Sequence, residues 1–506
     1  MKVINIIILF FVLSMSLNSQ PFVNIDAGFT GVMQSTGSWI DYNNDKFIDV
    51  LITGEKFSGN NQILTSNLYT NSKAKAFYKL NTYLPEVYRA SVDWGDFDKD
   101  GDKDLIICGE TNNKKIITNI YKNNGYGKLL LLPTNITPVR DGSVHWGDYD
   151  KDGNLDILVS GQSYNNNVIT KIYRNNGNNI FSPIICGLDA VYLSSAKWGD
   201  YDSDGDLDIL LSGQKYNGVT ISKVYKNIGN NKFESLPLLI EGLRMSDVEW
   251  CDFNKDGKLD FIICGENFNN QIITKVYKNT GNDKFVEVRT NIPGVRSGSI
   301  DLKDYDCDGD FDVLISGESY EKAITKVYRN DGNFVFNDIN AGLPGVYMGA
   351  AYWGDYDNDC DKDILILGLN NCYDYIAKLY RNDGENVEKK KVEEVNDSGI
   401  WTTSSYAIPQ RGPLYYFVYS SCYCDPYKKG QDYHTYISNV HRTKTPYDLH
   451  NMFNSLIRKN VSTWPEIDQG HRVSIGYEKK ASAAKARTNI IREYTEEEFH
   501  VHYVEW

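Results

Sequence analysis

Seven stretches of the sequence follow the pattern Asp-x-Asp-x-Asp-Gly-x-x-Asp, four of them in full and three with one or two substitutions, which places oxygen-bearing side chains at positions 1, 3, 5 and 9 of a nine-residue loop. We number them loop one to loop seven; they start at residues 41, 96, 148, 200, 252, 304 and 355. The residues at these four positions are, in loop order, Asp41, Asn43, Asp45 and Asp49; Asp96, Asp98, Asp100 and Asp104; Asp148, Asp150, Asp152 and Asp156; Asp200, Asp202, Asp204 and Asp208; Asp252, Asn254, Asp256 and Asp260; Asp304, Asp306, Asp308 and Asp312; Asp355, Asp357, Asp359 and Asp363.

Carboxylates crowded on one tight turn are ligands that suit Ca²⁺, and a glycine at position 6 permits the positive φ of such a turn. Position 12 is apolar in every loop, so the loops are not EF-hands, which carry Glu there. We predict up to seven Ca²⁺ sites, mainly structural, because each ion would cross-tie two strands. The alternative is that Asp and Gly only form turns. Lys46 and Cys360 replace the glycine in loops one and seven, which predicts that these two sites bind weakest.

Each loop has the same neighbours. A Trp stands two residues before six of the loops, a β-branched run ending in Gly follows each loop, and then comes an alternating strand pattern built on Tyr. Four short strands per repeat of about 50 residues are typical of a β-propeller blade. The seventh repeat lacks its fourth strand, and residues 22–25 resemble it. We therefore predict an all-β seven-bladed β-propeller over residues 20–384, whose N-terminal strand closes the last blade.

The repeats resemble those of the FG-GAP/VCBS superfamily, which includes the integrin α-subunit propeller, over about residues 22–384. The resemblance implies calcium loops between the first two strands of each blade on one face, and ligand recognition often on the other face. Trp-Gly-Asp before the loop and Gly-Glu or Gly-Gln after it replace the integrin-type flanks. The repeats are therefore more similar to the bacterial VCBS-type branch.

Two further sets of equivalent positions carry arginine and aromatic residues. Eight residues before the loops stand Met33, Tyr88, Arg140, Tyr192, Arg244, Arg296 and Tyr347, and three residues after each strand-ending Gly stand Phe57, Asn112, Tyr164, Tyr216, Phe268, Tyr320 and Asn371. If the metal loops lie on one face, both sets ring the other face. We predict that Tyr88, Arg140, Tyr192, Arg244, Arg296 and Tyr347 bind sugars or acidic groups. The alternative is that these residues pack the scaffold, as we expect of the six Trp.

The two ends of the chain differ from the repeats. Lys2, the apolar run from Ile4 to Leu17 and small residues up to Ser19 predict a secretory signal peptide over residues 1–19, with an uncleaved anchor as the alternative. No other stretch has the ~20 apolar residues of a membrane span. The product is thus expected outside the cell or at its surface.

We predict that residues 385–399 form a charged linker and that residues 400–506 form a small α+β domain of no recognised family. Helices are predicted from Pro446 and over 481–494, and strands over 414–419, 436–440, 472–477 and 499–504. Within this domain, Cys422 with Cys424 and His500 with His502 could offer ligands to Zn²⁺. Of the nine cysteines, Cys108 and Cys264 fit small buried positions, and the pairing of the others stays open.

The formal charge is −14, from 53 basic and 67 acidic residues, which argues against nucleic-acid binding. The four ligand positions of the loops hold 26 of those acids, and seven Ca²⁺ ions would bring the charge of the chain close to zero. We predict a secreted calcium-binding propeller that recognises glycan or extracellular protein ligands in adhesion. The alternatives are an extracellular polysaccharide-active enzyme, a hydrolase or toxin-like effector in the C-terminal domain, and a structural surface component. No repeat carries an inserted His/Glu/Asp cluster, which favours recognition over catalysis.

Overall fold

The computed structural model describes residues 22–125 and 128–383, together with the backbone of six strands between Leu414 and Val504. The chain divides into two units, Met1–Lys391 and Val392–Trp506. The predicted signal peptide and the linker lie outside the described residues. Among the described residues, no helix is long and apolar enough to cross a membrane.

The described residues of the first unit form β-strands and one 3-10 turn, η1 (Tyr164–Asn166). The strands up to the third loop are β1 (Phe22–Ile25), β2 (Met33–Ile40), β3 (Asp49–Ser58), β4 (Asn61–Asn71), β5 (Phe77–Lys79), β6 (Tyr88–Gly95), β7 (Asp104–Glu110), β8 (Ile116–Asn123), β9 (Leu129–Leu132) and β10 (Arg140–Gly147). They continue with β11 (Asp156–Gln162), β12 (Val168–Asn175), β13 (Phe181–Pro183), β14 (Tyr192–Gly199), β15 (Asp208–Gln214), β16 (Thr220–Asn227), β17 (Phe233–Ser235), β18 (Leu243–Cys251) and β19 (Asp260–Asn267). The last are β20 (Ile272–Gly281), β21 (Lys284–Val288), β22 (Arg296–Lys303), β23 (Asp312–Glu318), β24 (Ala323–Asn330), β25 (Phe336–Asp338), β26 (Val346–Gly354), β27 (Asp363–Asn370) and β28 (Tyr375–Asn382).

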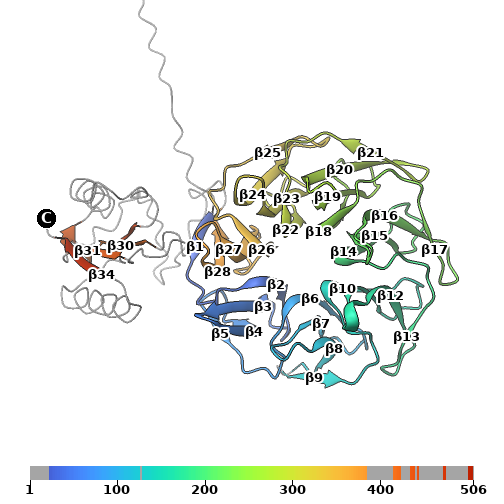
Figure 1. The fold of residues 1–506 in the computed structure, drawn as a ribbon, viewed down its shortest axis with the longest axis horizontal. Helices are drawn as coiled ribbons and strands as arrows, with labels where there is room; N and C mark the ends of the chain where they lie inside the picture. The colour runs from blue at the N-terminus through green and yellow to red at the C-terminus, as the bar shows by residue number, and fades with distance from the viewer. Residues whose placement is uncertain are drawn as a thin grey trace, which may run out of the picture. The chain divides into compact units, whose positions relative to one another are not determined.

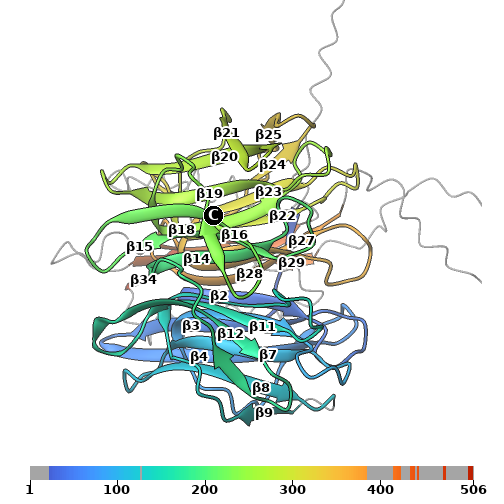
Figure 2. The same ribbon diagram turned by 90° about the vertical axis from the view of Figure 1, so that its right-hand side faces the viewer.

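These strands form antiparallel sheets of a repeated four-strand pattern. The sets β2–β5, β6–β9 and β10–β13 are separate sheets, whereas β14–β21 and β22–β28 with β1 form two eight-stranded sheets that each contain two such sets. The first strand of each set packs against the first strand of the next, and β26 packs against β2. The sets therefore stand around a closed ring, as Figure 1 shows face-on and Figure 2 from the side. This arrangement is a β-propeller.

The N-terminal strand completes the sheet of the last set. β1 pairs antiparallel with β28 along its whole length, from Phe22 opposite Asn382 to Ile25 opposite Leu379. The edge of β28 is thereby covered by a segment more than 350 residues earlier in the chain, which confirms the strand pairing predicted for residues 22–25.

The second strand of each set lies at the centre of the packing. All seven residues of β7, for example, are buried, because both faces of the strand lie against neighbouring sets. Between sets, the ring of Trp198 stacks on Tyr149 of the preceding loop at 6.2 Å and 6°. A Cβ on Gly147 would lie 2.6 Å from the Trp198 ring, so only glycine fits before this loop. The Trp residues thus pack between neighbouring sets, as predicted.

A buried asparagine at the end of each third strand ties neighbouring sets together. Nδ2 of Asn227 donates to the carbonyl oxygen of Leu207 in its own loop at 3.3 Å and to that of Tyr149 in the preceding loop at 2.9 Å. The same side chain of the first set, Asn71, reaches the carbonyl oxygen of Tyr356 at 2.7 Å. The last and first sets are therefore joined by the contact used elsewhere in the ring.

The described strands of the second unit are β29 (Leu414–Tyr416), β30 (Val418–Cys422), β31 (His434–Ser438), β32 (His441–Thr443), β33 (His471–Val473) and β34 (His500–Val504). β29 pairs with β32, and the other four form one sheet in the order β33-β30-β31-β34, with β31 and β34 parallel. The two helices predicted there lie outside the described residues, so the α+β class of this unit stays a prediction.

Candidate functional site

Backbone amides fold each acidic loop around its first carboxylate. In loop three, Oδ1 of Asp148 accepts from the amide of Asp152 at 3.1 Å, and Oδ2 accepts from the amide of Gly153 at 2.9 Å. Oδ1 of Asp152 in turn accepts from the amide of Asn154 at 2.8 Å. The carboxylates at positions 1 and 5 are thereby held in fixed orientations before any ligand binds.

All seven loops have a left-handed residue at position 6. In the five loops with glycine there, φ lies between 80° and 92°, and Lys46 and Cys360 adopt 74° and 76°. The left-handed turn predicted from the glycine is therefore also present in the two loops without glycine. There the left-handed conformation of Lys46 and of Cys360 costs about 1 kcal/mol of folding free energy each. Position 4 is left-handed in every loop as well, and no loop has glycine there. The sequence pattern gave no indication of this second left-handed residue.

The aspartate at position 9 is fully buried in all seven loops. It starts the second strand and ties it to the loop and to the end of the third strand. In loop three, Oδ2 of Asp156 accepts from the amide of Tyr149 at 3.3 Å, and Oδ1 accepts from the amide of Asn175 at 2.7 Å. Burial raises the pKa of Asp156 to about 7, with the carboxylates of Asp150 and Asp152 adding to the shift. A nearby cation would favour the charged form of this group.

Five loops bring three carboxylates close enough to share one ion, with one oxygen of each within 4.8 Å of the others. These clusters are Asp96, Asp98 and Asp104; Asp148, Asp150 and Asp156; Asp200, Asp202 and Asp208; Asp304, Asp306 and Asp308; and Asp355, Asp357 and Asp359. The two remaining loops carry Asn43 and Asn254 at position 3. Whether loops one and seven bind weakest stays a prediction.

Buried carboxylate oxygens without a hydrogen-bond partner show that a cation fits these loops. Oδ1 of the position-3 residues Asp98, Asp150, Asp202 and Asp357 is buried and unpartnered among the described residues, as is Oδ1 of Asp200. A buried anionic oxygen needs a positive partner, and an all-oxygen set suits a hard divalent ion. Several of the predicted loops can therefore hold a metal ion.

Basic side chains from the third strand reach into the same loops. Arg174 lies 2.7 Å from Asp150 and 3.1 Å from Asp152, and Lys122 makes ion pairs with Asp98 and Asp100. These cations offset part of the repulsion between the loop carboxylates when no metal is bound. In the sequence, each of these basic residues directly follows the repeated Tyr of its strand. Their contact with the loops could not be predicted, because it depends on the strand register.

The predicted ligand residues lie at the starts of the first strands, at the end of the propeller away from the loops. Arg140 makes an ion pair with Glu110 and donates from its η2 nitrogen to Gln162 at 2.9 Å. Arg296 binds Glu318 at 2.8 Å and also pairs with Glu266, which Arg244 contacts as well. The guanidinium groups that were predicted to meet a ligand are thus already engaged by protein acids.

The tyrosines of the same set begin or adjoin their strands. Tyr88 and Tyr192 are the first residues of β6 and β14, and Tyr347 is the second residue of β26. All three are partly exposed, and burial and Glu110 raise the pKa of Tyr88. No described contact tests the predicted binding role of these six residues, which stays a prediction.

The second group of predicted residues, three positions after each strand-ending Gly, is more exposed to solvent. We call Phe57, Tyr164, Tyr216, Phe268 and Tyr320 the aromatic rim; all five lie in or beside the hairpin after the second strand, and all are exposed. The most exposed is Tyr216 at 78%. Tyr164 donates from its hydroxyl to the carbonyl oxygen of Ile116 at 2.7 Å, and the hydroxyl of Tyr320 accepts from the amide of Ile272 at 2.8 Å. Tyr164 and Tyr320 therefore contact the neighbouring strand set through their hydroxyls and remain exposed to solvent.

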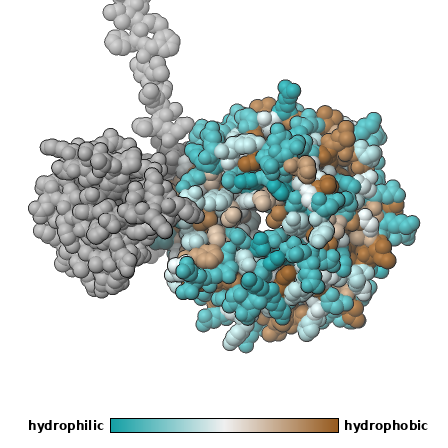
Figure 3. All heavy atoms as spheres, in the orientation of Figure 1, coloured by the Kyte–Doolittle hydropathy of each residue, from teal (hydrophilic) through white to brown (hydrophobic). Residues whose placement is uncertain are grey.

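The innermost strands carry a further group of polar residues that the sequence analysis missed. The position just before the Trp, or before Leu302 in the sixth repeat, differs in nearly every repeat; we call these side chains the axial residues, namely Ser38, Asp93, His145, Lys197, Glu249, Asp301 and Tyr352. They lie on the strands that surround the middle of the ring, where Figure 3 shows a hollow. Variation at one position of an otherwise regular repeat was the signal that could have found them.

Contacts between neighbouring strands hold the axial residues in place. Nζ of Lys197 lies 2.5 Å from Glu249, and Nδ1 of His145 lies 3.7 Å from Asp93. Although burial alone would lower it, the acids Glu249 and Asp247 raise the pKa of Lys197. Burial and Lys197 lower the pKa of His145, so this imidazole is neutral near pH 7. The axial residues thus combine a cation, a neutral imidazole and several acids that keep partial access to solvent.

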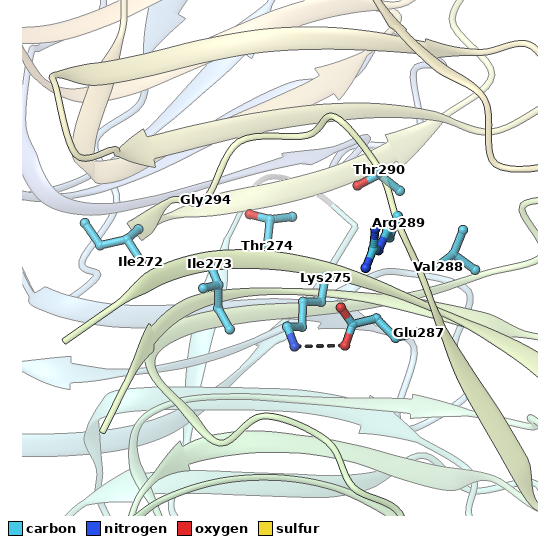
Figure 4. Close-up of a pocket in the computed structure, with 9 residues that line it drawn as sticks. All are labelled: Ile272, Ile273, Thr274, Lys275, Glu287, Val288, Arg289, Thr290 and Gly294. Atoms are coloured by element: carbon cyan, nitrogen blue, oxygen red, sulfur yellow. Dashed lines mark hydrogen bonds and ion pairs between the residues drawn. The ribbon is translucent and has the colours of Figure 1, made fainter. Parts of the chain in front are cut away.

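Two cavities among the described residues contain none of the six residues predicted to bind sugars or acidic groups. One cavity of about 350 Å³ lies between β20, β21 and the segment up to Gly294. Figure 4 shows Lys275 joined to Glu287 across it, at 2.8 Å, with Arg289 and Thr290 beside them. Lys275 and Glu287 thus neutralise each other in this cavity, and Arg289 is a second cation in its lining.

Of the residue pairs predicted to offer zinc ligands, Cys424 lies outside the described residues. Cys422 ends β30 opposite His434 of β31, and His434 is also the register partner of His500 in β34. Their side chains lie outside the described part of the chain, so the zinc site stays a prediction.

Comparison with known proteins supports the repeat assignment. The family described as FG-GAP-like repeat matches residues 41–107, 96–159, 148–211 and 252–315. No curated protein sequence matches the chain significantly.

Solved structures with some likeness include AofleA from Arthrobotrys oligospora, with 13% identity, coverage of 59% of this chain and 84% of that chain, and a TM-score of 0.37. A fucose-specific lectin from Aleuria aurantia has 10% identity, coverage of 56% and 88%, and a TM-score of 0.34. A sialidase from Trypanosoma rangeli has 12% identity, coverage of 63% and 57%, and a TM-score of 0.34. These likenesses are too distant to carry an argument. The repeats themselves, matched four times between residues 41 and 315, place the propeller of this chain in the FG-GAP/VCBS repeat superfamily.

Proposed function

We propose that the chain is a secreted recognition module, a seven-bladed propeller stabilised by Ca²⁺ that binds glycans through its aromatic rim. In this proposal each four-strand set is a blade, with β1 completing the seventh. Ca²⁺ occupies the acidic loops, where unpartnered buried oxygens such as Oδ1 of Asp150 support a bound cation. Protein ligands on the same face are the main alternative partners.

The observation that carries the proposal is the repeated exposure of aromatic rings at equivalent positions. Tyr216, Phe268 and Tyr320 are 78%, 70% and 69% exposed in successive repeats, although burying such rings would stabilise the fold. Aromatic faces stack on the apolar faces of sugar rings, while nearby polar groups satisfy the hydroxyls. Arg140, Arg244 and Arg296 are already paired with protein carboxylates. We therefore assign glycan binding to the aromatic rim.

A glycan array probed with the full chain, with Ca²⁺ and with a chelator, tests the proposal. Tyr216→Ala with Phe268→Ala should reduce binding at least about tenfold, because each stacked ring contributes roughly 1 kcal/mol. Tyr78→Ala, at an exposed tyrosine of β5 outside the aromatic rim, is the matched control and should bind like the wild type. Unchanged binding by the double variant would rule out the aromatic rim as the binding surface.

The axial residues favour a second candidate, an extracellular polysaccharide-active enzyme. A neutral imidazole at His145 beside Asp93 could accept a proton, and Glu249 could act as an acid because burial raises its pKa to about 7. Release of new reducing ends from a panel of polysaccharides, lost in His145→Ala, would support catalysis. Binding without any turnover would leave recognition as the function.

A further inference from the structure

Loops six and seven differ from the other loops at two positions, and both differences are cysteines. Position 4 is Asn, Lys or Ser in the other loops and Cys307 in loop six. Position 6 is Gly or Lys in the other loops and Cys360 in loop seven. Both thiols are exposed. Whether the two substitutions are related depends on how consecutive loops meet.

Position 4 of one loop lies against position 6 of the next around the ring. A Cβ on Gly205 would lie 2.7 Å from Nζ of Lys151, and one on Gly309 would lie 3.2 Å from Nζ of Lys255. Between the last loop and the first, Nδ2 of Asn358 donates to the carbonyl oxygen of Lys46 at 2.8 Å. The contact is therefore a regular feature of the repeat.

Cys307 and Cys360 occupy this same contact between loops six and seven. Sγ of Cys307 lies 3.9 Å from the carbonyl oxygen of Cys360. The amide of Cys360 is fixed by Oδ2 of Asp355 at 3.1 Å, and the φ of the residue is 76°, where glycine is favoured. Cys307 therefore meets Cys360 at a contact where both residues are cysteine, and the backbone of Cys360 is held in place by its own loop.

We infer that Cys307 and Cys360 form a disulfide that joins metal loops six and seven. With oxidised glutathione as the oxidant, the thiolate of one cysteine attacks the glutathione disulfide and releases one glutathione thiol. The thiolate of the second cysteine then displaces the other glutathione from the mixed disulfide. The protein loses two protons and two electrons and gains one S–S bond, while the oxidant becomes two thiols. Disulfides of this kind persist in the oxidising compartments that the proposed export implies.

Peptide mapping of the full chain tests the bridge directly. After equilibration with a glutathione redox buffer, free thiols are alkylated, and the protein is digested with trypsin without reduction. Lys322, Lys326 and Arg329 lie between the two cysteines, so the cysteines fall on different tryptic peptides. We expect a linked peptide pair lighter by two hydrogen atoms than its separate parts, which disappears on reduction. Alkylation of both thiols, or a link from either to another cysteine, would overturn the inference.

Thermal unfolding gives an independent readout. Reduction should lower the Tm of the wild type by roughly 5 °C, because the bridge closes a long loop. The variant Cys307→Ser with Cys360→Gly restores residues that other loops carry at these positions, so we expect it to fold. Its Tm should not respond to reductant. Equal responses of wild type and variant would show that the Cys307–Cys360 pair carries no bridge.

Discussion

Replacing Asn71 by alanine tests whether the first and last strand sets are joined as firmly as any internal pair. Asn71 ends β4 and is 1% exposed. Its Nδ2 donates to the carbonyl oxygens of Tyr356 at 2.7 Å and Ile48 at 3.1 Å, and its Oδ1 accepts from the amide of Ala74 at 2.8 Å. Alanine removes all three bonds and leaves the buried carbonyl of Tyr356 without its donor.

The expected loss follows from these contacts. An unsatisfied buried carbonyl costs about 1–3 kcal/mol, and the partly buried bond to Ile48 contributes about 1 kcal/mol more. The amide of Ala74 can bind water instead, because that residue is partly exposed. Together these contributions predict that Asn71→Ala lowers the free energy of unfolding by about 2–4 kcal/mol.

Urea unfolding followed by tryptophan fluorescence measures the effect where it arises. Trp39 packs against Gly354 at the same junction, and it is one of nine tryptophans in the chain, so the emission reports on unfolding of the whole ring, this junction included. Asn227→Ala is the matched control, since Asn227 donates to two carbonyl oxygens at an internal junction, at 2.9 and 3.3 Å. We expect the two variants to lose similar stability. A loss below about 0.5 kcal/mol in Asn71→Ala, beside about 2 kcal/mol or more in Asn227→Ala, would refute an equivalent closing contact.

Three further predictions concern the metal loops, the axial residues and the packing between sets. Chelation should lower the Tm, because each site filled at one hundred times its Kd adds about 2.7 kcal/mol, and Asp150→Ala should bind one Ca²⁺ fewer in isothermal titration. Burial raises the pKa of Asp301 to about 6, so its proton stabilises the fold below about pH 4, and this contribution is lost as the pH rises to about 6. Asp301→Asn keeps one acceptor oxygen for the amide of Trp353 and should remove that part of the pH dependence of urea unfolding. Gly147→Ala should lose about 1–3 kcal/mol in the same assay, because its Cβ would overlap the Trp198 ring.

Each of these predictions has an outcome that contradicts it. A Tm that is unchanged by chelation would leave the loops as ordinary acidic turns. An Asp301→Asn protein whose stability follows the wild-type curve from pH 4 to pH 6 would place the titrating group elsewhere. For the glycine, Gly177→Ala is the control, because it has a positive φ but open space around its Cβ, and it should lose only about 1 kcal/mol. A loss in Gly147→Ala no larger than that in Gly177→Ala would show that the Trp198 ring yields to the added methyl group without cost.

Features that recur in every repeat could be predicted from the sequence, because they depend on local geometry. The left-handed turn at position 6 needs only the residues of one loop, and Lys46 and Cys360 adopt it even without glycine. The N-terminal strand could be placed because residues 22–25 match an element that the last repeat lacks. In both cases comparison of the copies supplied the missing information.

Contacts between repeats could not be predicted from the sequence, because they depend on the strand register and on how neighbouring strand sets pack. Arg140 and Arg296 looked available to a ligand because Glu110 and Glu318 lie 30 and 22 residues away along the chain. The axial residues were missed for a different reason. A search for residues that recur in every repeat does not detect a position that is His145, Lys197 and Glu249 in successive copies.

Binding at the aromatic rim and binding at the axial residues would differ in the number of ligands bound per chain. The aromatic rim repeats similar rings at five places around the propeller, so a ligand that binds there can be bound several times by one chain. Weak individual sites would then give strong retention of a polymer with many copies of the ligand, because each further contact is made at high effective concentration. The axial residues surround one hollow and differ from repeat to repeat, so they can define a single asymmetric site. The stoichiometry of a bound monosaccharide, several per chain or one, thus distinguishes the two surfaces without any mutation.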